Sequence, residues 1–128
     1  MNISLVRRGS LVALAAATVL AALVAGSRAA STPQFTTRDL GTLGLDSYSV
    51  ALNDHGQVTG YSYTVNAALA FSWTESEGMS DLGTLGGTYT VPMAINNSGQ
   101  IVGQAHTPAG SSAFLWSKAG GIVNLGGS

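Results

Sequence analysis

The sequence contains no cysteine, and charged residues occupy only 9% of its positions. Without cysteine no disulfide can hold the fold, so side-chain packing and backbone pairing must do so. The same absence excludes thiol chemistry and cysteine-based zinc sites. The few charged residues are unevenly distributed, and two arginines lie close together near the N-terminus.

The N-terminal segment has the three-part pattern of a secretory signal peptide, predicted to span residues 1–29. Arg7 and Arg8 form a positive n-region, and the run LVALAAATVLAALVA that follows is apolar and uncharged. Small residues at Ser27 and Ala29 fit the −3 and −1 positions of a signal-peptidase site, which predicts cleavage after Ala29. The run is shorter than the roughly 20 apolar residues of a membrane span, and an uncleaved anchor is the alternative. The arginine pair leaves Sec and Tat export both open.

Cleavage at this site would leave a weakly acidic chain, residues 30–128. It keeps Arg38 and Lys118 against six acidic residues, a formal charge of −4. Nucleic-acid binding needs a basic patch that displaces counterions from phosphates, and anionic membrane surfaces attract clusters of lysine and arginine. The composition therefore argues against both partners. A chain of this length makes one domain at most.

Three blocks of sequence recur in the same order at an interval of 42 or 43 residues. "DLGTLG" begins at Asp39 and again at Asp81, and "NLGG" begins at Asn124. "ALNDHGQVTG" returns as "AINNSGQIVG", and "AFSW" returns as "AFLW". Such self-similarity at a fixed period indicates a repeat architecture. The predicted units are repeat one (39–80), repeat two (81–123) and the start of a third repeat (124–128).

Each repeat is predicted to contain four short antiparallel strands. Residue types that favour strands recur in eight segments, and no segment after Ala30 shows a helical period of 3.6 residues. The segments are 48–53, 57–63, 68–73 and 79–82 in repeat one, and 89–96, 100–105, 112–116 and 122–125 in repeat two. N-x-x-G at 53–56 and 96–99 fits a type I turn closed by a G1 bulge. The predicted fold is therefore all-β, with tandem four-stranded meanders resembling β-propeller blades, about two and a half repeats without ring closure.

Strand alternation predicts which side chains form the core. The expected core face in repeat one consists of Ala51, Asn53, Val58, Gly60, Phe71 and Trp73. Its counterparts in repeat two are Ala94, Asn96, Ile101 or Val102, Gly103, Phe114 and Trp116. The two glycines are expected to leave room for a neighbouring blade. Because both tryptophans recur with the repeat, we interpret them as core residues rather than as a sugar-stacking platform.

The Asp-Leu-Gly motif is predicted to end the fourth strand and lead into the next repeat. Its Asp or Asn side chain can accept backbone N–H groups in an Asx turn, and its glycines can adopt dihedral angles that other residues avoid. Leu43 and Leu85 are expected to pack this connection onto the core. Because Asp39 and Asp81 recur with the fold, we interpret them as structural rather than as a catalytic pair or calcium ligands.

The sequence identifies no catalytic, cofactor-binding or metal-binding residue. His55 and His106 occupy non-equivalent loop positions and form no metal motif of known spacing. No G-x-S-x-G elbow is present, and the GTLGG loop has neither the helix nor the lysine of a phosphate-binding loop. The turn at Asn53 and Asp54 is a weak calcium candidate. Asn96 begins a glycosylation sequon, expected to be unmodified in a tight turn if the source is bacterial.

The stretch DLGTLGGTYTVPMAINNSGQIVGQAHTPAGSSAFLWSKAGGIVNLGG resembles the HAF repeat, a bacterial extracellular repeat of about this length. That repeat is usually written around D-L-G-x-L-G-G, A-x-x-I-N-x-x-G-Q-V-V-G and H-A-F-x-W. The resemblance covers essentially all of residues 30–128, but the histidine that names the repeat is replaced by Leu69 and Ser112. It implies export and a repeat fold, and it implies no reaction.

We therefore expect an exported, non-catalytic repeat protein, secreted, periplasmic or at the cell surface, that binds an unidentified glycan or protein. One alternative is a polysaccharide-active enzyme that uses a propeller face, for which the carboxylates outside the repeat blocks are Asp46, Glu75 and Glu77. Another is a structural fragment of a longer repeat protein. Because a short repeat array does not bury its own faces, self-association through open sheet edges is also expected.

Overall fold

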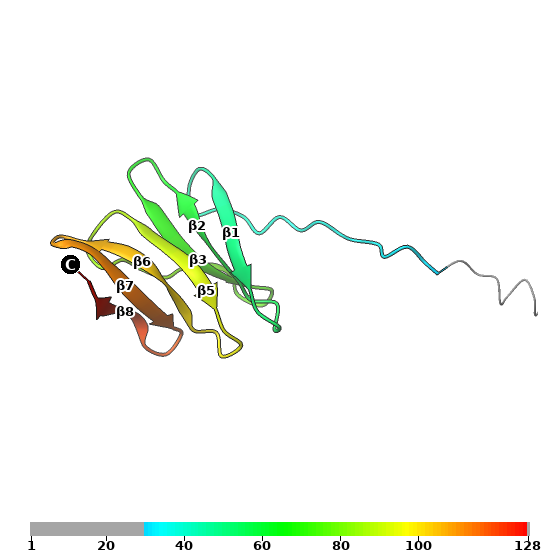
Figure 1. The fold of residues 1–128 in the computed structure, drawn as a ribbon. Coiled ribbons are helices and arrows are strands. Elements are labelled where there is room, and N and C mark those ends of the chain that lie inside the picture. Colours follow the sequence, from blue (N-terminus) through cyan, green and yellow to red (C-terminus); the bar gives the residue numbers. More distant parts are fainter. Residues whose placement is uncertain (1–29, 128) are drawn as a thin grey trace, which may run out of the picture. The chain divides into compact units, whose positions relative to one another are not determined.

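The computed structural model describes residues 30–127, and the predicted signal peptide and its cleavage site at Ala29 lie outside the described residues. The chain divides into two units, Met1–Thr37 and Arg38–Ser128. In the first unit, the described residues 30–37 form neither helix nor strand and are exposed. The second unit contains every strand of the described chain (Figure 1).

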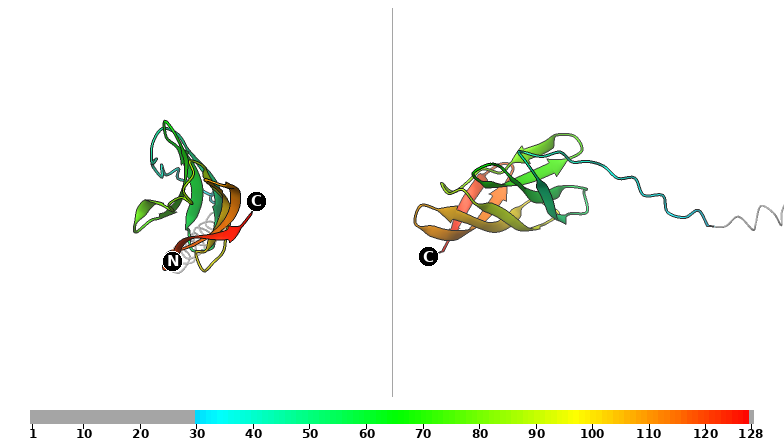
Figure 2. Two further views of the ribbon diagram at one scale, coloured as in Figure 1. Left: turned by 90° about the vertical axis from the view of Figure 1, so that its left-hand side faces the viewer. Right: turned by 90° about the horizontal axis from the view of Figure 1, so that it is seen from above.

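Eight strands form two four-stranded antiparallel sheets (Figures 1 and 2). Sheet A consists of β1 (Ser47–Leu52), β2 (Val58–Tyr63), β3 (Ala68–Thr74) and β4 (Gly78–Asp81), in that order. Sheet B consists of β5 (Thr90–Ile95), β6 (Ile101–Thr107), β7 (Gly110–Ser117) and β8 (Gly121–Gly126). Within each sheet every strand pairs with the next along the chain, so the predicted all-β tandem of meanders is confirmed. Residues 30–127 include no helix able to span a membrane.

The strand register defines two faces on each sheet. The tryptophan face carries Leu52, Val58, Trp73 and Met79 on sheet A, and Ile95, Ile101, Trp116 and Ile122 on sheet B. The reverse face carries Ala51, Thr59, Ser72 and Ser80 on sheet A, and Ala94, Val102, Leu115 and Val123 on sheet B. The two rows of each face correspond position by position, at the interval of the sequence repeat.

The core lies between the reverse face of sheet A and the tryptophan face of sheet B. Ala70 of sheet A clusters with Ile101, Ala105 and Phe114 of sheet B, and each is fully buried. Leu82, which follows β4, is 3% exposed and completes the cluster. Burying an aliphatic or phenylalanine side chain contributes about 1.5–3 kcal/mol, so this interface is the main source of stability. Leu85 packs against the cluster, as predicted.

Phe71 and Phe114 have matching neighbours within their own sheets, although Phe114 alone belongs to the core cluster. Phe71 pairs with Gly60, and Phe114 pairs with Gly103. A Cβ atom at Gly60 would lie 2.7 Å from Phe71 Cζ, and one at Gly103 would lie 2.8 Å from Phe114 Cε1. The space beside each glycine is therefore filled from its own sheet, by the carbonyl oxygen of Tyr48 or Val91 on the preceding strand and by the ring on the next strand, and not by a neighbouring blade as the sequence predicted.

Ala51 and Ala94 lie on the reverse face, which corrects their predicted place beside the phenylalanines. The register of β1 shifts between Ser49 and Ala51, and that of β5 shifts equivalently before Ala94. An extra residue in one strand inverts the alternation beyond it. For the same reason Leu52 takes the position on the tryptophan face. Of the two candidates in β6, Ile101 is the one that faces the core.

The Asp-Leu-Gly motif forms an Asx turn at each of its occurrences, as predicted. The backbone amides of Gly41, Gly83 and Gly126 donate to Oδ1 of Asp39, Asp81 and Asn124 at 2.9, 2.8 and 2.8 Å. The three glycines have φ angles of 86°, 88° and 101°, a region in which glycine carries no steric penalty. The motif therefore recurs because the same backbone reversal recurs.

The two N-x-x-G turns also form as predicted, and they contact each other. Oδ1 of Asn53 and of Asn96 each accepts hydrogen bonds from the amides two and four residues later, at 2.9–3.0 Å. Gly56 and Gly99 have φ angles of 74° and 76°. In addition, Asn53 Nδ2 donates to the Asn96 carbonyl oxygen at 3.0 Å. The turn of repeat one is thereby tied to the turn of repeat two.

The two equivalent asparagines should differ in their contribution to stability. Asn53 is 6% exposed, so Asn53→Ala leaves buried backbone groups unpaired and should destabilise the protein by about 2–3 kcal/mol. Asn96 is exposed and water can replace its side chain, so Asn96→Ala should cost about 1 kcal/mol. Urea unfolding of the two variants measures the difference. Equal losses would contradict a stabilising role for the bond between the turns.

Candidate functional site

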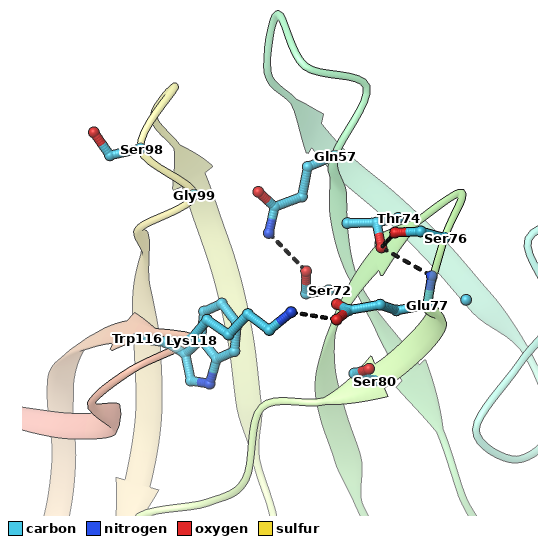
Figure 3. A pocket seen from close by; sticks show the side chains of 11 residues that line it. Gln57, Ser72, Thr74, Ser76, Glu77, Ser80, Ser98, Gly99, Trp116 and Lys118 are labelled. Atoms are coloured by element: carbon cyan, nitrogen blue, oxygen red, sulfur yellow. Dashed lines mark hydrogen bonds and ion pairs between the residues drawn. The ribbon is translucent and has the colours of Figure 1, made fainter.

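A cleft of about 570 Å³ opens between the two sheets, at the end where the N-x-x-G turns lie (Figure 3). Its volume falls within the range of about 300–1,000 Å³ that is typical of small-molecule sites. One wall comes from the reverse face and turns of sheet A, and the other from sheet B and its first turn. The lining residues are Gln57, Ser72, Thr74, Ser76, Glu77, Gly78, Ser80, Ser98, Gly99, Trp116 and Lys118.

The cleft exists because sheet A carries small side chains where it faces Trp116. Ser72 and Ser80 line the cleft from the reverse face of sheet A. The corresponding positions of sheet B hold Leu115 and Val123. Larger side chains at the two serine positions would fill the space, so the cleft follows from a difference between the repeats and not from the repeat itself.

Six of the residues that line the cleft carry a hydroxyl or amide group, and these groups stand among apolar surface. Gln57 Nε2 donates to Ser72 Oγ at 2.8 Å, and the Glu77 amide donates to Thr74 Oγ1 at 3.3 Å. Lys118 and Glu77 form an ion pair that bridges the two sheets (Figure 3). Their side chains are 76% and 48% exposed, so the pair contributes about 0–1 kcal/mol to stability. It does, however, leave the cleft with no net charge.

Trp116 contributes to both the core and the cleft. It is partly buried and packs against the core cluster, while its remaining surface lines the cleft. Trp73 holds the same register position in sheet A but has different neighbours. The guanidinium carbon of Arg38 lies 5.2 Å from the Trp73 ring centroid, and Arg38 also pairs with Glu75 at 2.5 Å. The prediction that both tryptophans are core residues therefore holds in part for Trp116, while Trp73 does not join the core cluster.

A second aromatic group lies at the opposite end of sheet A, and the sequence analysis missed it. Tyr48 stacks on Tyr61 with ring centroids 5.4 Å apart, and Tyr63 meets these two rings edge-on at 5.9 and 5.5 Å. Tyr48 and Tyr63 are 49% and 43% exposed. The sequence did contain a sign of this cluster, because the second repeat has Val91, Gln104 and His106 at the equivalent positions. The three tyrosines are therefore specific to repeat one and are not needed to form the repeat fold.

The tyrosine cluster should be detectable by titration. Partial burial, together with the neighbouring Tyr63 and Tyr48 hydroxyls, raises the pKa of Tyr61 above its ordinary value. A raised pKa means that the neutral ring contributes stability below a pH of about 10, and that this contribution is lost as pH rises through the folded-state pKa. Ultraviolet absorbance should show a late-ionising tyrosine that Tyr61→Phe abolishes. Tyr89→Phe removes the smallest of the tyrosine influences on the Tyr61 pKa and serves as the control: the late phase should persist in it, and loss of that phase would contradict the assignment.

Two further polar residues that the sequence singled out, Asp54 and His106, have local contacts. Asp54 Oδ2 accepts a hydrogen bond from Asn97 Nδ2 at 2.8 Å, and the Asp54 amide donates to Asn97 Oδ1 at 3.0 Å. The imidazole of His106 lies 4.8 Å from the Tyr89 ring, centroid to centroid. Within residues 30–127, no three His, Cys, Asp or Glu side chains converge on a point where a metal ion could bind.

The chain matches no protein-family model, no curated protein and no solved structure. Its own residues and geometry are therefore the basis for assigning a function. Among the features described above, the cleft combines a volume open to solvent, an indole wall and several hydrogen-bonding groups, which makes it the candidate binding site.

Proposed function

We propose that the chain is an exported, non-catalytic HAF-type repeat protein that binds a neutral oligosaccharide in the cleft between sheets A and B. The observation that carries this proposal is the lining of the cleft, an indole wall opposite hydroxyl and amide groups. One face of a pyranose ring is apolar and can stack on an indole. The ring's hydroxyl groups require both donors and acceptors, which serine, threonine and glutamine side chains supply.

The charge of the cleft also supports a neutral ligand. Lys118 and Glu77 neutralise each other across its mouth, so neither a phosphate nor a cation would find an unpaired partner charge. A polyhydroxylated ligand can instead exchange hydrogen bonds with both groups. Because hydrogen bonds to charged groups are stronger than those between neutral groups, the ion pair gives an oligosaccharide two well-placed anchors without a preference for charge.

Binding is better supported than hydrolysis. Glycosidases act through two carboxyl groups that flank the scissile bond, about 5–10 Å apart. Among the residues that line the cleft, Glu77 supplies the one carboxylate, and Lys118 already pairs with it. Of the other acidic residues outside the repeat blocks, Glu75 pairs with Arg38. The lining therefore offers a stacking surface and hydrogen bonds but not an acid and a nucleophile.

Binding can be tested with linear neutral hexose oligomers as probes. Trp116→Ala should weaken binding about tenfold or more, because the stacking surface is lost. The matched control is Trp73→Ala, which removes the equivalent indole outside the cleft. In Trp73→Phe the remaining indole should still change its fluorescence on titration, and calorimetry measures both affinities. Equal affinities in the two alanine variants would contradict the proposed site.

A second pair of variants covers the case in which Trp116→Ala impairs folding. Glu77→Ala removes a carboxylate inside the cleft, and Glu75→Ala removes a more exposed, ion-paired carboxylate outside it. We expect only the former to weaken binding. Release of reducing ends from the probe by the wild-type protein would favour the enzyme alternative over a binding module.

Export is proposed from the charged n-region, the apolar run and the small residues before Ala30. The protein recovered outside the cytoplasm should begin at Ala30, because signal peptidase selects small side chains at −3 and −1. Mass spectrometry of the recovered protein measures its N-terminus. Ala29→Leu should block processing, whereas Ala30→Ser should leave it unchanged. Cytoplasmic retention of the full-length wild-type chain would contradict export.

A further inference from the structure

In the row of residues nearest the N-x-x-G turns, the exposed reverse face of sheet B carries apolar side chains where the buried reverse face of sheet A carries hydroxyl groups. On sheet A, Thr59 and Ser72 are 0% and 5% exposed. The corresponding residues of sheet B, Val102 and Leu115, have no sheet against them, and Val102 is 40% exposed. An antiparallel sheet with one solvated face normally places its polar residues on that face. The inversion indicates that the reverse face of sheet B is covered by another surface.

The tryptophan face of sheet A carries the side chains that would cover it. Leu52, Val58, Trp73 and Met79 stand at the register positions of Ile95, Ile101, Trp116 and Ile122, and the latter row packs on a reverse face inside the chain. Leu52 is 72% exposed. Each chain therefore presents one exposed face of each kind at matching register positions, with Val102 and Leu115 on sheet B where sheet A has Thr59 and Ser72.

We propose that a second copy of this chain docks the tryptophan face of its sheet A onto the reverse face of sheet B, and so repeats between copies the order in which the two kinds of face meet inside the chain. The contact is head-to-tail, because the two surfaces that meet are different. The occupant is a second copy because the complementary face is present in this chain. Sheet faces, rather than the sheet edges that the sequence favoured, then carry the self-association.

The chain's own residues Arg38, Asp39 and Leu40 partly occupy the docking face. Arg38 lies over Trp73, and Leu40 borders the same hollow as Phe71 and Met79. In the repeat alignment, residues 38–40 correspond to Val123–Leu125. In the docked pair, Val123–Leu125 of the other copy would therefore lie where residues 38–40 lie now. Its ion pair with Glu75 is exposed on both sides and contributes only about 0–1 kcal/mol, so we expect the second copy to displace it. Arg38→Ala should then tighten association severalfold.

Sedimentation of the purified protein over roughly a hundredfold range of concentration tests the proposal, since mass action governs association. The wild-type protein should grow beyond a dimer, because each copy retains a free face at either end. Val102→Glu disables the reverse face of sheet B, and Leu52→Glu disables the tryptophan face of sheet A. Each variant alone should weaken association by about two orders of magnitude, because docking would bury an unpaired carboxylate.

An equimolar mixture of the two variants is the decisive measurement. Each variant keeps one intact face, so the mixture should form a heterodimer that cannot extend. Val65→Glu, at a residue 83% exposed between β2 and β3, should behave as wild type. If Val102→Glu fails to fold, Ala94→Glu on the same exposed row replaces it.

Three outcomes would overturn the proposal. A wild-type protein that stays monomeric at every concentration would show that something other than a second copy covers sheet B. Self-association of either variant alone would show a contact between identical faces. A mixture that stays monomeric, with both variants folded by circular dichroism, would show that the two mutated faces do not meet.

Discussion

The packing of large side chains from sheet B into the small-residue face of sheet A is the constraint on which the rest of the structure depends. Ile101 and Phe114 are fully buried against that face, and the burial of apolar area is the dominant favourable term in folding. The same size difference leaves the gap beside Trp116, where serines stand opposite an indole. Core and cleft are therefore two ends of one interface, and a change that enlarges the serines would remove the cleft while leaving the core in place.

The sequence predicted those features that depend on contacts within a few residues. The N-x-x-G turns and the Asp-Leu-Gly turns are fixed by hydrogen bonds from one side chain to amides two or four residues away. Such local bonds specify a turn before any tertiary contact exists, and the turns in turn set the strand boundaries. The β-bulges in β1 and β5 could not be predicted in this way, because they are specified by pairing with β2 and β6. One extra residue was enough to place Ala51 and Ala94 on the wrong face.

The candidate site was missed for a related reason. A residue that recurs in both repeats was interpreted as structural, so Trp116 was assigned to the core. The serines opposite Trp116 were not considered as part of a site. The informative positions are those at which the repeats differ, such as Ser72 against Leu115, or Tyr61 against Gln104. The repeat alignment contains these differences, but their meaning depends on which face each residue occupies. That knowledge requires the register of both sheets and the way in which one packs on the other.

Equivalent residues in an open array of sheets do not have equivalent surroundings. Trp116 meets the small face of sheet A, whereas Trp73, at the same register position, meets the guanidinium of Arg38. Arg38 covers an indole that would otherwise face water, and it does so with a cation that can be displaced more readily than a packed side chain. The reverse face of sheet B has no comparable cover among the described residues. The two exposed faces therefore differ: a displaceable cation covers the tryptophan face of sheet A, and the reverse face of sheet B is uncovered. Because unlike faces would meet, an assembly of these chains would have all its copies pointing the same way.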